Sequence, residues 1–443
     1  MSPMHRDQGP SGLNRREFLK RAAAAGIAIP SLSAIVAACG KGASTGVSTS
    51  QGPGSGSQFG TGGISGAAYP LARQNAPVTW KVQSDNPLIA SNMPPETGAT
   101  LKVMRWPYYF DQGVLDDFAK KYKCDVQVTE FDDMDKGLAK INSGQGDFDI
   151  MFGMNVWALG RSIAAGLIRP VNNDYIPNLA ANVWDQFQSP FYDIGSQFSV
   201  PYSVWNTGIF WRNDKIQIDP ASMSNPYDVF WDNPPKGKTH LLGNAQDVLA
   251  LAMFHDGLTD VNVTDPATIS KAKDEIAEVA TAAGGVKYDH LEYDAGDILD
   301  AGAWLHQSWS GNASDTVVFL TDKSKADVYS YYWPGTDGHP ANVDNDLTVL
   351  LSTGKNPVLA HLLIDWVFDG DHALANFTNT TGYQMPLKSM TRESMVGSGI
   401  VPEALSTVIV TEDDFNKGSR ELELPTDADA LWLQAFDELQ SGV

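Results

Sequence analysis

The stretch TLKVMRWPYYFDQGVLDDFAKKYKCDVQVTEF, residues 100–131, decides the fold class. TLKVMR alternates apolar and polar residues, as a half-buried strand does. GVLDDFAKKY then places Leu115, Phe118, Ala119 and Tyr122 at the i, i+3, i+4, i+7 spacing of one helix face. DVQVTEF alternates again. The order strand, helix, strand predicts two parallel strands joined by a crossover helix.

The same alternation continues, with a helix expected over 134–144, a strand over 147–152 and a helix from 156 to about Gly166. This order predicts a doubly wound parallel sheet. In open α/β sheets, ligands bind beyond the carboxyl ends of the strands. The aromatic segment RWPYYF (105–110) and the segment GMNVW (153–157) follow two such strands. We therefore expect these aromatics to meet a ligand rather than to fill the core.

The rest of the chain adds an extended segment over 198–213 and strands over 327–335 and 345–351. The apolar spacing predicts helices over 245–257, 267–284, 357–370 and 430–440. NVDND, residues 342–346, has oxygen-bearing side chains but lacks the glycine and the distal glutamate of a calcium loop, so it is interpreted as an acidic loop.

The amino terminus resembles an export signal. Arg15 and Arg16 in NRREFLK resemble the twin-arginine motif, and an uncharged run of small residues follows up to Cys39. VAAC, residues 36–39, resembles a bacterial lipobox, so we expect residues 1–38 to be removed and Cys39 to be lipidated. The run contains Pro30 and is less apolar than a membrane span requires. We thus expect a protein anchored by lipid to the outer face of the cell membrane, or periplasmic.

Two segments without periodicity separate this signal from the sheet. Residues 40–66 are rich in Gly, Ser and Thr, which predicts a flexible tether. Residues 67–99 contain Trp80 and five prolines, and form either more linker or a strap laid on the body.

Charge and cysteine content exclude some classes of protein. The chain has 443 residues, with 31 Lys and Arg against 53 Asp and Glu, a formal net charge of −22. A nucleic-acid partner is not expected for so acidic a chain. The two cysteines exclude a disulfide framework, and Cys124 is expected to be a small buried hydrophobic residue.

No catalytic, metal or cofactor motif is present in the sequence. It has no HExxH pair, no G-x-S-x-G elbow, no phosphate loop and no GxGxxG after a strand. We therefore expect no cofactor and no metal. The carboxylates are too numerous to exclude a glycosidase pair, but no spacing singles one out.

Four segments together resemble the spermidine/putrescine-binding proteins of ABC importers: LKVMRWPYYFDQGVLDDF, VTEFDDMDKGLAKINSGQGDFDIMF, GLIRPVNNDYIPNL and SVPYSVWNTGIFW. The resemblance implies an α/β, two-lobed periplasmic-binding-protein fold of type II. Each lobe would be a doubly wound, mostly parallel sheet with flanking helices, and the ligand cleft would lie between the lobes. Lobe 1 would comprise 100–206 and 346–392, and lobe 2 would comprise 207–345 and 393–443.

The resemblance also implies a set of ligand-binding residues. Ammonium groups would lie on aromatic faces and beside carboxylates, because an unpaired desolvated charge is costly. The positions that match are Trp106, Tyr108, Tyr109, Asn244, Asp247, Trp309, Asp344 and Tyr383. Met154 and Val156 stand where the family has polar contacts, and the family's glutamine close to the final helix is replaced by an apolar or acidic residue near Leu422.

These features imply a monomeric, non-catalytic receptor that delivers a small cationic solute, with a polyamine as the leading ligand, to a membrane permease. Three alternatives remain open at this point. The ligand could be a different amine or an unrelated solute, or the chain could be an exported carbohydrate-active hydrolase or a surface adhesion protein.

Overall fold

The computed structural model describes residues 59–60, 68–144, 146–289, 302–320 and 323–442. The predicted export signal at Arg15 and Arg16, the lipidation site Cys39 and all of the tether except Phe59 and Gly60 lie outside the described residues. Residues 56–443 form one compact unit, which is described below. Within the described part, no helix is both long and apolar enough to span a bilayer.

Three parallel strands begin the central sheet, in the order β4-β3-β5. Asp111 and Asp133 cap the helices α3 and α4, each accepting a hydrogen bond from a backbone amide of the first helical turn. The predicted β-α-β-α-β order is confirmed over β3 (Thr100–Arg105), α3 (Gln112–Tyr122), β4 (Asp125–Glu130), α4 (Met134–Asn142), β5 (Ile150–Asn155) and α5 (Val156–Ala164).

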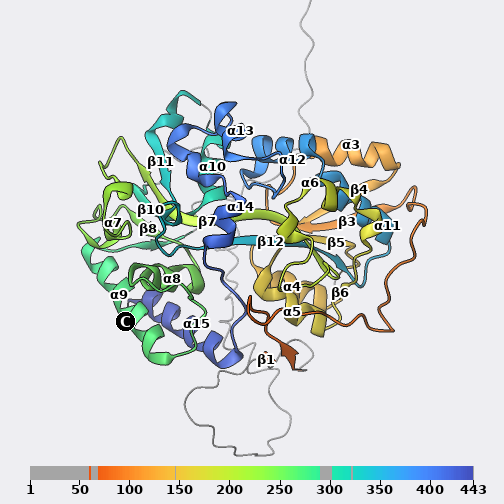
Figure 1. Cartoon of the computed structure of the whole chain (residues 1–443), viewed down its shortest axis with the longest axis horizontal. Helices are drawn as coiled ribbons and strands as arrows, with labels where there is room; N and C mark the ends of the chain where they lie inside the picture. Colours follow the sequence, from red (N-terminus) through yellow and green to blue (C-terminus); the bar gives the residue numbers. More distant parts are fainter. Residues whose placement is uncertain (1–58, 61–67, 145, 290–301, 321–322, 443) are drawn as a thin grey trace, which may run out of the picture. The chain divides into compact units, whose positions relative to one another are not determined.

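Two long antiparallel strands, β7 (Ser199–Arg212) and β12 (Val343–Leu351), connect the two halves of the sheet (Figure 1). The first part of β7, up to Asn206, pairs with β12, which also pairs with β5 and with β6 (Ile168–Arg169). The second part of β7 pairs with β10 (Leu305–Trp309) and β11 (Tyr329–Tyr332). Both halves of the sheet therefore include part of β7.

The second half repeats the α/β pattern. β8 (Thr239–Leu241) runs parallel to β10 and to β9 (Lys287–Tyr288). Helices α8, α9 and α15 pack against one another and bury one apolar core (Figure 1). The helices of this half are α7 (Asp228–Trp231), α8 (Ala245–His255), α9 (Pro266–Ala282), α10 (Ser310–Phe319) and α15 (Thr426–Ser441).

The remaining helices cover the half of the sheet that contains β3, β4 and β5, or follow β12 in the chain. α11 packs on α3, α6 and β12, and α12 continues into a π-helical turn over Phe377–Thr381. Their bounds are α6 (Pro177–Asn182), α11 (Pro357–Val367), α12 (Gly370–Asn376), α13 (Arg392–Gly397) and α14 (Glu412–Lys417).

Residues 68–99 pack along the body. The short strands β1 (Phe59–Gly60) and β2 (Tyr69–Pro70) form an antiparallel pair. Trp80 is buried and its Nε1 donates to the carbonyl of Tyr192 at 2.8 Å. The hydroxyl of Tyr69 donates to Glu423 at 2.5 Å.

The expected α/β, two-lobed fold class is confirmed, with parallel outer strands and antiparallel crossing strands. Cys124 is a free, buried cysteine, as predicted. The predicted acidic loop over 342–346 is wrong, because β12 begins at Val343 and Asp344 and Asp346 are buried within it. The oxygen-rich composition suggested solvent exposure, but Val343–Asp346 pair with β7, and Asp346 also pairs with β5.

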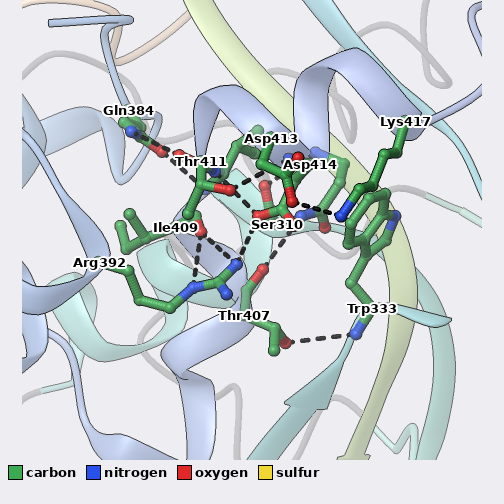
Figure 2. A network of polar contacts seen from close by, with 12 residues as sticks. Ser310, Trp333, Gln384, Arg392, Thr407, Ile409, Thr411, Asp413, Asp414 and Lys417 are labelled. Carbon is green, nitrogen blue, oxygen red and sulfur yellow. Dashed lines mark hydrogen bonds and ion pairs between the residues drawn. The ribbon is translucent and has the colours of Figure 1, made fainter. Parts of the chain in front are cut away.

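A network of polar contacts fixes the chain around α13 and α14 (Figure 2). Arg392 donates to the carbonyl of Ile409 and, at 2.7 Å, to Asp414, which also accepts from the backbone of Thr411. The buried Gln384 donates to the carbonyls of Met390 and Val410 and accepts from the amide of Val410. One side chain thus satisfies three buried backbone groups.

Replacing Gln384 with alanine should lower the free energy of unfolding by about 2–4 kcal/mol, because buried backbone groups lose their partners. Urea unfolding followed by circular dichroism measures this change. The control is Gln434→Ala, which removes an exposed contact with Glu438 and should cost less than about 0.5 kcal/mol. Equal effects of the two variants would contradict the role given to Gln384.

Candidate ligand-binding site

Asp247 lies in the first turn of α8, where the fold surrounds its carboxylate with neutral donors. Asn244 caps the helix by accepting from the Asp247 amide at 2.9 Å, and its Nδ2 donates to Asp247 Oδ2 at 2.7 Å. Trp309 Nε1 donates to the same oxygen at 3.0 Å, and Thr207 Oγ1 donates to Oδ1 at 3.0 Å. Asp247 is 3% exposed. The structure therefore brings the predicted Asn244, Asp247 and Trp309 together, and adds Thr207.

Asp346 forms a second centre, on β12. Its carboxylate accepts from the Tyr109 hydroxyl at 2.6 Å, from Ser203 Oγ at 3.1 Å and from Asn155 Nδ2 at 3.1 Å. The predicted residues Tyr109 and Tyr383 thus meet here, since their ring centroids lie 6.1 Å apart. The Tyr383 hydroxyl also donates to Asn312 Oδ1 in α10 at 2.8 Å.

Trp106 is half-buried beside this centre. Its Nε1 donates to the Gly153 carbonyl at 2.7 Å, and its ring lies 4.5 Å from that of Phe131. Gly153 has a φ of +89°, and a Cβ there would lie 2.2 Å from Trp106 Cδ1 and 2.7 Å from Tyr109 Cε1. Only glycine therefore lets both rings approach the strand. Tyr108, in contrast, is 44% exposed at the surface.

Asp344 lies between these centres and already has a cationic partner. Arg420 Nε is 3.4 Å from Asp344 Oδ1, and the backbone amides of Asn345 and Glu421 donate to the carboxylate. Arg420 itself is buried, stacks over Phe415 at 3.8 Å and donates to Asn345 Oδ1. Asp344 is thus held by the protein's own arginine.

Four buried carboxylates belong to one electrostatic cluster. Burial is the main cause that raises the pKa of Asp247 and of Asp346 to about 6, and repulsion from Asp344 adds to it. Burial likewise raises the pKa of Asp344, and burial followed by repulsion from Asp247 and Asp344 holds that of Glu421 well above its usual range. Among the described residues, Arg420 is the one lysine or arginine paired with any of the four. Without a ligand, the cluster therefore favours protonated carboxyl groups over ionised carboxylates.

A small cavity adjoins the Asp247 centre. It is bounded on its polar side by Thr207, Asp247, Asn342 and Glu421 and on its apolar side by Tyr227, Leu251 and Phe254. The arrangement places hydrogen-bond acceptors and hydrophobic surface around a space that holds about one water molecule.

Several contributing residues were not predicted from the sequence. Asn342 and Asp346 lay in the supposed acidic loop, and Glu421 lies outside any periodic pattern. Met154 is fully buried in β5 rather than beyond its end. The predicted strand over 345–351 already contained Asp346, and extending it backwards by two residues to Val343 would also have placed Asp344 in β12.

Comparisons with known proteins agree with this architecture. The spermidine/putrescine-binding periplasmic protein 1 of Haemophilus influenzae is 23% identical over 349 residues, covering 77% of this chain and 89% of that protein. A putrescine/cadaverine-binding protein of Pseudomonas aeruginosa is 24% identical over 291 residues, covering 65% of this chain and 79% of that protein.

Two solved structures share the fold. A spermidine/putrescine ABC transporter substrate-binding protein from Streptococcus pneumoniae superposes with a TM-score of 0.63 at 19% identity, covering 78% of this chain and 99% of that chain. The Tp0655 lipoprotein of Treponema pallidum superposes with a TM-score of 0.63 at 15% identity, covering 77% of this chain and 99% of that chain. The family model for bacterial extracellular solute-binding proteins matches residues 105–369, more than half of the chain. The chain therefore belongs to the bacterial extracellular solute-binding protein family.

Proposed function

We propose that this protein is the substrate-binding receptor of an ABC importer and that it captures a small cationic solute, most simply a polyamine. The observation that carries the proposal is the cluster of four buried carboxylates with a single arginine. Buried charge without a partner is costly. A ligand that brings ammonium groups removes this cost, whereas a neutral or anionic ligand does not.

The aromatic residues support the same class of ligand. Trp309 and Tyr109 donate hydrogen bonds to the carboxylates, and Trp106 packs with Tyr109 against Gly153. Rings of this kind attract cations by roughly 0.5–2 kcal/mol. Methylene groups pack on the same rings. The names of the relatives from Haemophilus influenzae and Pseudomonas aeruginosa, which bind spermidine, putrescine or cadaverine, point the same way.

Entry of the ligand requires a hinge motion, because the acids are buried. The proposed lobes are 100–206 with 346–392, and 207–345 with 393–443. Their boundary falls in β7 where its pairing partner changes from β12 to β10. Binding would stabilise the closed state by joining Asp247 and Trp309 of one lobe to Tyr109 and Asp346 of the other.

The proposed receptor performs no bond chemistry. It acts as a monomer, is exported through the twin-arginine route and is anchored through Cys39, from which it delivers the solute to a permease. The match to the family of extracellular solute-binding proteins and the names of the relatives support binding rather than hydrolysis.

Isothermal titration calorimetry on the purified protein tests the proposal directly. Spermidine or putrescine should bind at least about tenfold more tightly than butane-1,4-diol, which has the putrescine spacer without its charges. Trp309→Phe keeps the ring but removes the donor to Asp247, and should weaken amine binding by about threefold to tenfold. If the diol and the diamine bind equally, the cationic-ligand proposal is wrong.

Asp247→Asn should separate binding from stability. The folded-state pKa of about 6 exceeds the ordinary 3.8, so ionisation costs stability as pH rises between these values, and the full cost remains above them. Removing the charge should raise the free energy of unfolding at pH 7.5 by about 1–3 kcal/mol and leave it nearly unchanged at pH 4.

The amide can keep the local hydrogen bonds, because the Thr207 hydroxyl can accept from the new Nδ2. The same variant should bind spermidine at least about tenfold more weakly. Chemical unfolding at the two pH values and calorimetry measure both effects. A variant that is less stable at pH 7.5, or that binds normally, would refute the role given to Asp247.

A further inference from the structure

We propose that residues 68–80, here called the clamp, hold a third connection between the halves of the sheet, residues 419–425, and thereby restrict the hinge motion through which ligand enters and leaves. The clamp precedes residues 105–369, the range that the family model matches. Its effect on ligand release rests on the proposed function, whereas its effect on the connection is measurable without a ligand.

Residues 419–425 pass from one half of the sheet to the other, as β7 and β12 do. Leu422 packs in the apolar core formed by β3, β5 and α5, whereas Leu424 packs in the core of α8, α9 and α15. Asn262, which precedes α9, accepts from the Leu422 amide at 2.7 Å, so the second half also holds the backbone here. The chain therefore changes halves close to Glu423.

Two side chains of the clamp hold Glu423. The Tyr69 hydroxyl donates to its carboxylate at 2.5 Å, and Arg73 donates to its backbone carbonyl at 2.8 Å. Arg161 of α5 donates to the same carboxylate oxygen at 2.9 Å. A Cβ on Gly160 would lie 3.1 Å from Glu423 Oε2 and 3.2 Å from the Tyr69 ring, so the glycine leaves room for both. The clamp, α5 and the third connection therefore meet at one point.

The other end of the clamp is fixed to the first half. The Val78 amide donates to the Phe191 carbonyl at 2.8 Å, and the Val78 carbonyl accepts from the Ile194 amide at 2.9 Å. Trp80 is buried and donates to the carbonyl of Tyr192. These partners precede β7 and belong to the proposed lobe that contains β3, β4 and β5. The clamp thus ties Glu423 to this lobe.

These contacts oppose rotation of one half against the other. A hinge motion must shift Glu423 relative to the clamp or relative to the core that holds Leu424. The structure makes the clamp contacts together with the hydrogen bond between Tyr383 and Asn312, which joins the two proposed lobes. Loss of a clamp contact should therefore favour separated lobes and faster release of ligand.

Hydrogen exchange followed by mass spectrometry tests the clamp in the full-length protein without ligand. Tyr69→Phe keeps the ring but removes the donor to Glu423, and should raise exchange rates over 419–425 at least about threefold. Tyr175→Phe is the matched control, because this buried hydroxyl also bonds the backbone of residues 68–99, at Ala90 and Met93. It should leave exchange over 419–425 unchanged.

A second variant and a check of folding accompany this comparison. Arg73→Met removes the donor to the Glu423 carbonyl and should raise exchange over 419–425 as Tyr69→Phe does. Urea unfolding should give similar midpoints for the two Tyr→Phe variants, so that a difference in exchange reports the connection and not the whole fold.

The rate of ligand release gives the functional measurement. Stopped-flow tryptophan fluorescence after dilution of the spermidine complex should show dissociation about threefold to tenfold faster in Tyr69→Phe and Arg73→Met than in the wild type, and an unchanged rate in Tyr175→Phe. The inference is overturned if Tyr69→Phe changes neither exchange nor release, or if Tyr175→Phe changes both as much. If spermidine does not bind the wild type, the proposed function fails, and the exchange rates alone decide whether the clamp holds the third connection.

Discussion

The cost of burying carboxylates without enough cations is the constraint on which the rest of the structure depends. Asp247, Asp344, Asp346 and Glu421 are all nearly enclosed, and Arg420 pairs with Asp344. Hydrogen bonds from Thr207, Trp309, Tyr109 and other neutral donors reduce this cost without supplying charge. A protein retains such a destabilising cluster when the cluster serves its function, and binding of a cationic ligand is the direct candidate for that function.

The two crossing strands create this constraint. β12 carries Asp344 and Asp346 two residues apart, so both acids lie on one face of a strand that is buried along its whole length. β7 carries Ser203 to one acid centre and Thr207 to the other. The same segments that join the halves of the sheet therefore hold the binding groups, which couples ligand contacts to any change in the angle between the halves.

Much of the fold followed from periodicity, and the site only in part. Strand and helix spacing in residues 100–166 predicted the first sheet correctly, and the position after a strand singled out Trp106 and Tyr109. Composition misled the prediction at residues 342–346, where oxygen-rich side chains indicated a loop but pairing with β5 and β7 buries them. Glu421 had no local signal, because a non-periodic segment far along the chain brings it to Asn342.

The most direct test is the number of protons released when spermidine binds at pH 6, measured by calorimetry in buffers with different enthalpies of ionisation. Asp247 and Asp346 have pKa values of about 6, so both are partly protonated in the ligand-free protein at this pH. An ammonium ligand favours their ionised forms, and the account predicts net proton release that fades toward pH 8. Binding that releases no protons at pH 6 would contradict the claim that these buried acids receive the cation.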